Sequence, residues 1–273
     1  MTQQRHDNDG SNGDNENNKI YTIQLDGNSA DGNLVISQLD HDGSRRGWMK
    51  LKHCGHGVAM GVQSRGKGKA PWIWTEESHG EKQAVRGTGL MRFVWDSGIT
   101  IAKGSKHTQY YKPFPHSSIN TCTIDPVNHR MAVRYLPQGK DKGLMISIFQ
   151  MDAKHPETDL DESTLVCTVP AHGESHPAGE FQGYALHGDY LYFLTGDKDK
   201  NGGGNTAISF INIQNPKVTH KPYHLGHADG REPEGMAIQV VHHPAQHKHK
   251  VRLCFGFSSK DRKASIWFKD VIG

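Results

Sequence analysis

Long apolar runs and paired cysteines are both missing from this chain of 273 residues. No apolar stretch approaches the ~20 residues that a membrane-spanning helix needs, so we expect no membrane span. The polar run after Met1 is unlike a signal peptide, and the chain, if complete, is therefore expected in the cytoplasm. None of the cysteines stands in a CxxC motif, which favours reduced core residues over disulfides or a zinc site. They are Cys54, Cys122, Cys167 and Cys254.

Common catalytic signatures are absent as well. The chain contains no GxSxG or HExxH motif, which removes the commonest hydrolase and zinc-peptidase patterns. The net charge is +3 with Lys and Arg spread along the chain, so there is no concentrated basic stripe and we expect no nucleic-acid partner. A hydrophobic content of 34% and 31 glycines favour many short strands joined by tight turns.

A short motif recurs along the chain and organises it. The motif is a polar residue, usually a glycine, and then an apolar-small-apolar run, and its copies begin 64, 62 and 52 residues apart. Self-similarity at about 40 to 50 residues or a little more is typical of propeller blades, so the sequence predicts an all-β, five-bladed β-propeller. The copies are His56-Gly57-Val58-Ala59-Met60, Asn120-Thr121-Cys122-Thr123-Ile124, Gln182-Gly183-Tyr184-Ala185-Leu186 and Glu234-Gly235-Met236-Ala237-Ile238.

Strand patterns around these motifs predict units of four strands. In the second unit, the strands after the His56 motif are expected at 72–76, 89–95 and 99–101. Both ends of the ring are expected to be incomplete, because the last unit lacks a fourth strand and the first unit lacks its first. The repeat would place that missing strand near Gln3 or Gln4. We therefore divide the chain into a flexible polar arm or degraded first strand over 1–18 and a single propeller domain over 19–273.

The polar residue of each motif is a candidate for the site. In a propeller the first strand of each blade lines the axis, so these side chains could converge and bind a ligand. The alternative is structural, with each polar group bonded to a neighbouring blade. The ligand-binding candidates are His56, Asn120, Gln182 and Glu234, together with Arg231 and Glu232, which could instead form a salt bridge with each other.

Two kinds of chemistry are open to this set. His56 facing Glu234 would make a general acid/base pair, as in a hydrolase or lyase. Oxygen atoms of Glu234, Asn120 and Gln182 could act as ligands of a calcium ion. The simplest expectation is that the protein has no cofactor. The tryptophans divide similarly: Trp48 is expected to be exposed, whereas blade packing is expected of Trp72, Trp74, Trp95 and Trp267.

Several segments taken in order resemble a known family. They are Gly32-Asn33-Leu34-Val35-Ile36, Trp48-Met49, Gly55-His56-Gly57-Val58, Trp72-Ile73-Trp74-Thr75-Glu76, Arg86-Gly87-Thr88, Ile124-Asp125-Pro126, Phe181-Gln182-Gly183-Tyr184 and Arg231-Glu232-Pro233-Glu234-Gly235-Met236. Over 19–273 they are similar to the secreted actinobacterial propellers labelled teichoic acid biosynthesis protein C-like or "signalling protein". Those proteins are similar in turn to receptor-binding propellers of phages and, more distantly, to helveticin J bacteriocins.

The resemblance implies an extracellular five-bladed propeller that meets cell-surface glycopolymer. The leading hypothesis is thus a non-catalytic, monomeric binding module for a cell-wall glycopolymer or another carbohydrate. A channel-site hydrolase or lyase and a protein-interaction scaffold are the alternatives.

Overall fold

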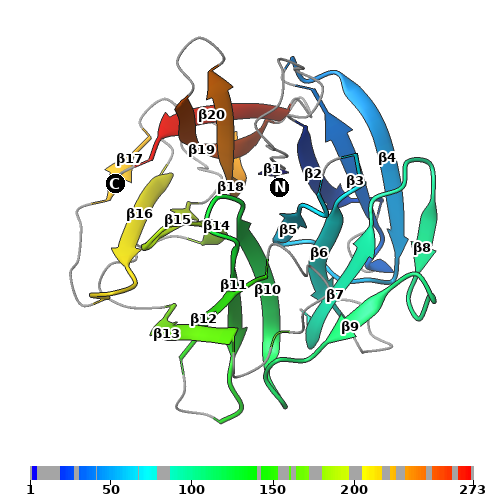
Figure 1. Ribbon diagram of the computed structural model, residues 1–273, viewed down its shortest axis with the longest axis horizontal. Helices are drawn as coiled ribbons and strands as arrows, with labels where there is room; N and C mark the ends of the chain where they lie inside the picture. The colour runs from blue at the N-terminus through cyan, green and yellow to red at the C-terminus, as the bar shows by residue number, and fades with distance from the viewer. Residues whose placement is uncertain are drawn as a thin grey trace.

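Five sheets stand around a central axis in the computed structural model (Figure 1). Within each sheet the first strand lies nearest the axis and the other strands follow one another outward. This arrangement confirms the predicted five-bladed β-propeller. The structure describes residues 2–4, 19–27, 31–40, 42–66, 68–78, 87–139, 143–152, 160, 164–171, 180–196, 205–216, 222–225, 231–243, 248–259 and 264–271. No helix in these ranges is long and apolar enough to cross a membrane.

The blades follow one another in chain order. Blade 1 contains β1 (Thr2–Gln4), β2 (Ile20–Leu25), β3 (Leu34–Leu39), β4 (Arg45–Lys52) and β8 (Thr100–Ala102). Blade 2 contains β5 (Met60–Gln63), β6 (Trp72–Glu77), β7 (Gly89–Val94) and β9 (Gln109–Tyr111). Blade 3 contains β10 (Ser118–Asp125), β11 (Arg130–Leu136), β12 (Met145–Gln150) and β13 (Leu165–Pro170).

The last two blades differ in strand number. Blade 4 contains β14 (Phe181–His187), β15 (Tyr190–Thr195), β16 (Ala207–Asn212) and β17 (Tyr223–His224). Blade 5 contains β18 (Arg231–His243), β19 (Lys248–Ser259) and β20 (Ala264–Asp270). Within the described ranges blade 5 therefore has three strands, as the sequence predicts for the last unit.

The hydrophobic core lies between successive blades. Ile23 and Leu34 of blade 1 pack in one cluster with Val62, Ile73 and Phe93 of blade 2. The sheets of blades 2 to 4 have two packed faces, so their middle strands are buried at successive positions. In blade 1, β3 and β4 instead alternate between buried and less buried positions. Burial between blades is consequently what holds the ring together.

The strand at 99–101 does not belong to the second unit, and that prediction is wrong. β8 pairs in parallel with β4 of blade 1, in the register Lys50 opposite Thr100, and β9 takes the outer place in blade 2. The turn before β8 directs the chain there, because Gly98 N donates to Trp48 O at 2.7 Å. Three residues with one buried position fit either neighbouring sheet, so periodicity alone could not distinguish them.

β1 closes the ring near the axis. It pairs antiparallel with β2, with Gln3 opposite Tyr21, and it contacts β18 of blade 5 and β5 of blade 2. It lies at the position near Gln3 and Gln4 where the repeat spacing places a first strand. Strand pairing uses backbone groups that every residue except proline possesses, so a polar segment can supply this strand.

Candidate functional site

β-Bulges set the orientation of the motif residues in the innermost strands. In β14 the pairing shifts between Phe181 and Gly183, which leaves Gln182 without a partner on β15. In β18 the same shift occurs between Pro233 and Gly235 and leaves Glu234 unpaired with β19. A bulge redirects the side chain of the extra residue, and bulges are common beside binding and active sites.

The glycines of the motif allow the innermost strands to approach each other. A Cβ atom placed on Gly183 would lie 2.8 Å from the Cα of Gly235 in the next blade. Real Cβ atoms do not come so close to backbone, so any larger residue here would push blades 4 and 5 apart. The glycines thus hold the two bulges side by side.

A cleft of about 930 Å³ lies between blades 1 and 5. Three of the predicted site residues, His56, Gln182 and Glu234, line it. Its walls come from β2 and β3 on one side and from β19 and β20 on the other. The remaining lining residues are Ile20, Thr22, Ile23, Gln24, Leu25, Ser37, Leu39, Asp40, Asp42, Gly43, Gly57, Val58, Glu180, Phe181, Gly256, Phe257, Ser258, Ala264, Ser265, Ile266 and Phe268.

The cleft wall is rich in hydrogen-bond acceptors and contains an exposed ring. Glu234 Oε1 accepts a hydrogen bond from Ser258 Oγ at 2.7 Å, and Gln182 Nε2 donates to Gly196 O at 2.8 Å, so both side chains are positioned. Phe268 of β20 is 42% exposed. Among the described lining residues there is no lysine or arginine, whereas Asp40, Asp42, Glu180 and Glu234 are carboxylates.

Asp40 carries a stable negative charge at one edge of this wall. Hydrogen bonds from Lys19 and from Arg46 lower the pKa of its carboxyl group below the usual value for aspartate. The pKa of Asp42 is also lowered, chiefly by the hydrogen bond from the backbone N–H of Ser44. Both groups are therefore ionised at neutral pH.

Asn120 does not join the other three motif residues. Its side chain is fully buried, where Nδ2 donates to Gly87 O at 3.1 Å and Oδ1 accepts from Ser117 Oγ at 3.0 Å. Asn120 thus ties blade 3 to blade 2, which is the structural alternative given above. Gln182 and Glu234 share the cleft without it, and no three His, Cys, Asp or Glu side chains of the described ranges are grouped to hold a metal ion.

Arg231 and Glu232 lie at the start of β18. Arg231 Nη1 donates to Ser265 Oγ at 3.1 Å, and its guanidinium lies 5.9 Å from the centre of the Trp267 ring. Ser265 lines the cleft, so Arg231 supports the wall from outside it. The proposed ion pair between Arg231 and Glu232 stays a prediction.

Sequence reasoning missed Glu76, which fixes the His56 motif. Its carboxylate is fully buried, and Oε1 accepts hydrogen bonds from the backbone N–H groups of His56 and Gly57 while Oε2 accepts one from Gly87 N at 2.8 Å. Buried carboxylates are stabilised when several N–H groups donate to them. The signal was a glutamate at the end of the buried strand Trp72-Ile73-Trp74-Thr75, where a charge needs a partner.

Three of the five tryptophans follow the prediction, since Trp72, Trp74 and Trp95 are buried between strands. Trp48 was expected to be exposed but is half-buried. Trp267 was expected to pack between blades but is 37% exposed. It lies on β20, the outer strand of blade 5, where no further described strand covers the sheet edge.

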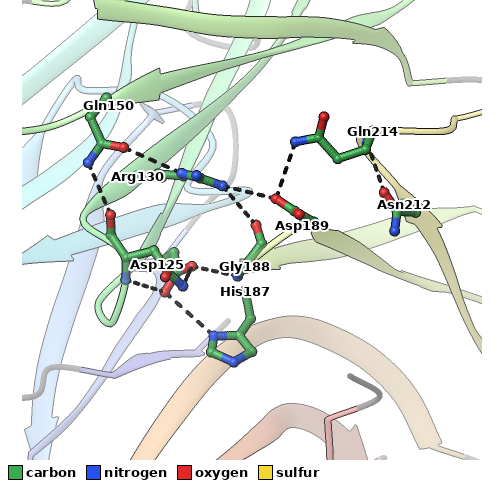
Figure 2. Close-up of polar contacts among 9 residues, drawn as sticks. Asp125, Arg130, Gln150, His187, Gly188, Asp189, Asn212 and Gln214 are labelled. Atoms are coloured by element: carbon green, nitrogen blue, oxygen red, sulfur yellow. Dashed lines mark hydrogen bonds and ion pairs between the residues drawn. The ribbon is translucent and has the colours of Figure 1, made fainter.

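A second polar cluster joins blades 3 and 4 and is shown in Figure 2. Asp125, at the end of β10, is fully buried and accepts hydrogen bonds from Asn128 Nδ2 at 2.7 Å and from Gly188 N of blade 4 at 2.8 Å. His187 Nδ1 lies 3.6 Å from its other oxygen. Beside it, Arg130 Nη1 donates to Asp189 Oδ1 at 3.2 Å.

Opposing effects set the pKa of Asp125. Burial raises it, but the nearby His187 imidazole and the hydrogen bonds from Asn128 and Gly188 together outweigh burial and leave the pKa below the usual value for aspartate. The carboxylate is thus satisfied by protein groups from both blades. We interpret this cluster as a structural junction.

Comparisons with known proteins agree with the architecture. A protein of Bacillus subtilis (strain 168) named "Putative major teichoic acid biosynthesis protein C" is 26% identical over 236 residues, which are 82% of this chain and 51% of that protein. The tail fiber of Staphylococcus aureus phage P68 has the same fold, with a TM-score of 0.68 and 18% identity over 98% of this chain and 49% of the fiber chain. The chain spans about half the length of both relatives.

A family model described as the phage 5-bladed beta propeller receptor binding platform domain matches residues 10–264. The match covers most of the 273 residues and part of every blade; of the cleft strands it includes β2, β3 and β19 and ends at the first residue of β20. The resemblance found in the sequence motifs is thereby confirmed. This chain belongs to the phage five-bladed β-propeller receptor-binding platform family.

Proposed function

We propose that this chain is a non-catalytic binding module whose cleft between blades 1 and 5 recognises the carbohydrate units of a cell-wall glycopolymer. One observation carries the proposal. The cleft of about 930 Å³ presents positioned acceptors, among them Glu234, beside the exposed ring of Phe268. Binding clefts of this size usually combine an apolar surface with a few polar groups that fix the ligand's orientation.

The lining chemistry suits a sugar. Sugar hydroxyl groups donate hydrogen bonds, and the carboxylates of Glu234 and Asp42 accept them strongly because they are charged. The apolar face of a sugar ring can pack on Phe268, as apolar surfaces do on aromatic rings. Bare phosphate would be repelled by these carboxylates, so the group that enters the cleft is uncharged or cationic.

The family supports the cell surface as the source of this sugar. Receptor binding is the role printed for the matching family, and a relative at 26% identity is named for teichoic acid biosynthesis. Both descriptions concern those proteins. Carried over to this chain, they favour a wall glycopolymer over a soluble saccharide, and they favour action outside the cell.

A second candidate function is a hydrolase or lyase at the same cleft. The observation in its favour is that His56 and Glu234, a possible acid/base pair, both line the cavity. Replacing Glu234 with Gln keeps the shape and removes the base. Turnover of wall polymer that is lost in Glu234→Gln would establish this second function.

Co-sedimentation with Gram-positive cell walls tests the binding proposal. We expect the protein to sediment with intact walls and to stay in solution when teichoic acid has been stripped. Phe268→Ala should weaken binding about tenfold, which corresponds to about 1.4 kcal/mol, an ordinary value for one aromatic contact. Tyr223→Ala is the matched control, because Tyr223 is also an exposed ring, at 45%, but lies on β17 outside the cleft.

Two results would overturn the proposal. One is the absence of sedimentation with intact walls. The other is equal loss of binding in Phe268→Ala and in Tyr223→Ala, because exposed rings in general would then explain the interaction and the cleft would not.

A further inference from the structure

Charge is distributed unevenly along the chain, and the net charge hides this. Residues 43–124 contain thirteen Lys and Arg but only four Asp and Glu. The remaining residues contain nineteen Lys and Arg and twenty-five Asp and Glu. The first group therefore has a net charge of +9 and the second of −6. Lys and Arg are spread along the whole chain, but Asp and Glu are scarce in residues 43–124.

The parallel strand β8 brings part of this stretch together in space. Because Lys52 of β4 lies opposite Ala102 of β8, the next residue, Lys103, follows directly alongside, and its backbone N donates to Lys52 O at 3.1 Å. Both lysines are exposed. The strand whose position the sequence failed to predict is thus the element that places them side by side.

A tight turn after β8 adds further basic groups. Ser105 N donates to Ala102 O at 3.0 Å, and the hydroxyl of Tyr110 accepts hydrogen bonds from Gly104 N and from Thr108 Oγ1, both at 2.8 Å. These hydrogen bonds fix the backbone of the turn, from which the side chains of Lys103, Lys106 and His107 are exposed. We call the resulting cluster the basic edge; it consists of Lys52, His53, Lys103, Lys106 and His107.

The carboxylates that the structure describes leave the lysines of the basic edge without ion pairs. Elsewhere on blade 1, Lys50 is bonded to Asp26 at 2.7 Å and Arg46 is bonded to Asp40. No described carboxylate forms an ion pair with Lys52, Lys103 or Lys106. Like charges held close together raise the local positive potential and attract a polyanion.

The basic edge lies close to the cleft along the chain. His53 is three residues before His56, which lines the cleft, so at most ~11 Å of extended chain separates the two positions. A single polymer could therefore contact both. The two surfaces have opposite chemistry, since carboxylates line the cleft and the three lysines of the basic edge are cations.

We propose that the basic edge binds the anionic phosphodiester backbone of the polymer whose sugar units enter the cleft. This inference rests on the proposed function. Lys52 and Lys103 lie on adjacent backbone segments and Lys106 follows in the turn, so a linear chain of phosphates can contact them in succession. The cleft selects the sugar, while the basic edge supplies charge attraction that depends on salt.

Inorganic polyphosphate is the probe, because it carries linear phosphate charge without sugar. We expect the full chain to bind it in low salt and to lose roughly tenfold or more in affinity between about 50 and 200 mM salt, as expected for about three phosphate contacts. The double variant Lys103→Glu and Lys106→Glu should bind it at least about tenfold more weakly. The matched control is Lys250→Glu with Lys269→Glu on blade 5, which changes the net charge equally, and it should lose less than about twofold. Circular dichroism on heating verifies that both variants fold.

The outcomes separate this inference from the proposed function. Lack of polyphosphate binding, equal loss in the control variant, or stronger binding to phosphatidylserine vesicles than to polyphosphate would overturn the role of the basic edge. Those results would leave intact the wall binding that depends on Phe268. Conversely, polyphosphate binding that needs Lys103 and Lys106, together with no sedimentation on walls, would overturn the proposed function and leave the basic edge as a polyanion site.

Discussion

The junctions on the two sides of the ring use their polar groups in opposite ways. Between blades 3 and 4, the Asp125 carboxylate and the Tyr184 hydroxyl find hydrogen-bond partners in the facing blade. Between blades 1 and 5, β1 contacts β18 near the axis, while Glu234 and Phe268 face an open cleft. The difference teaches that two blades form a packed junction where their polar groups bond to the facing blade, and leave room for a ligand where the blades stand apart.

Removal of Asp125 should give the largest effect on stability. Asp125→Ala leaves the N–H groups of the half-buried Gly188 and Asn128 without their acceptor and removes a buried charge that His187 faces, and we expect a loss of about 3 kcal/mol in the free energy of unfolding. Urea unfolding measures this value. Asp26→Ala is the control, since the partly exposed pair of Asp26 with Lys50 should contribute less than about 1 kcal/mol. Equal losses in the two variants would show that the junction is not packed as described.

The contribution of Asp125 should also depend on pH. Its folded-state pKa is lowered, so the stability it supplies is present above the unfolded pKa of about 4 and is lost as pH falls through the folded pKa. Asp125→Asn should therefore lower the free energy of unfolding at pH 7. Below about pH 4 the free energies of unfolding of the variant and the unmodified chain should become more similar. Unfolding curves across this range provide the test, and a difference that is constant with pH would contradict it.

Loss of the Tyr184 hydroxyl should have a smaller effect at the same junction. This hydroxyl donates to Thr121 O at 2.8 Å and accepts from Arg134 N at 3.2 Å, both in blade 3. Tyr184→Phe keeps the ring and leaves these groups unpaired, which should cost about 1 to 2 kcal/mol. Tyr223→Phe, at an exposed ring, should change stability by less than about 0.5 kcal/mol. Thermal unfolding of the two variants distinguishes them, and equal melting temperatures would argue against the bridge.

Substitution in the cleft should have the smallest effect on stability. Phe268 is 42% exposed on an outer strand, so Phe268→Ala should change the free energy of unfolding by less than about 1 kcal/mol while it weakens wall binding. Chemical unfolding and binding are measured on the same preparation. A loss of stability as large as that of Asp125→Ala would mean that the ring is a core residue and would remove the contrast between the junctions.

The sequence predicts the propeller because each repeat contains a short motif that can be recognised from neighbouring residues alone. The motifs at Gln182 and Glu234 share spacing, glycine and strand character, and these properties require no knowledge of neighbours. The parallel pairing of β8 depends on which blade accepts a three-residue strand, and that is a tertiary choice. Local pattern therefore predicts 99–101 in the wrong sheet.

The site could be predicted only in part, for the same reason. His56, Gln182 and Glu234 share the cleft, but Asn120 has the same place in its motif and is buried by contacts to Gly87 and Ser117. The spacing of residues cannot show whether a polar group finds a partner in the next blade. Phe268 has no motif at all, and its exposure follows from its place on the outer strand of blade 5.

Calorimetric titration of teichoic acid released from Gram-positive walls tests the central claim most directly. The account predicts that the unmodified chain and Tyr223→Ala bind the isolated polymer with equal affinity, and that Phe268→Ala binds it about tenfold more weakly. Equal affinity of Phe268→Ala and the unmodified chain, or no binding by any of the three proteins, would contradict the claim that the cleft between blades 1 and 5 is the binding site.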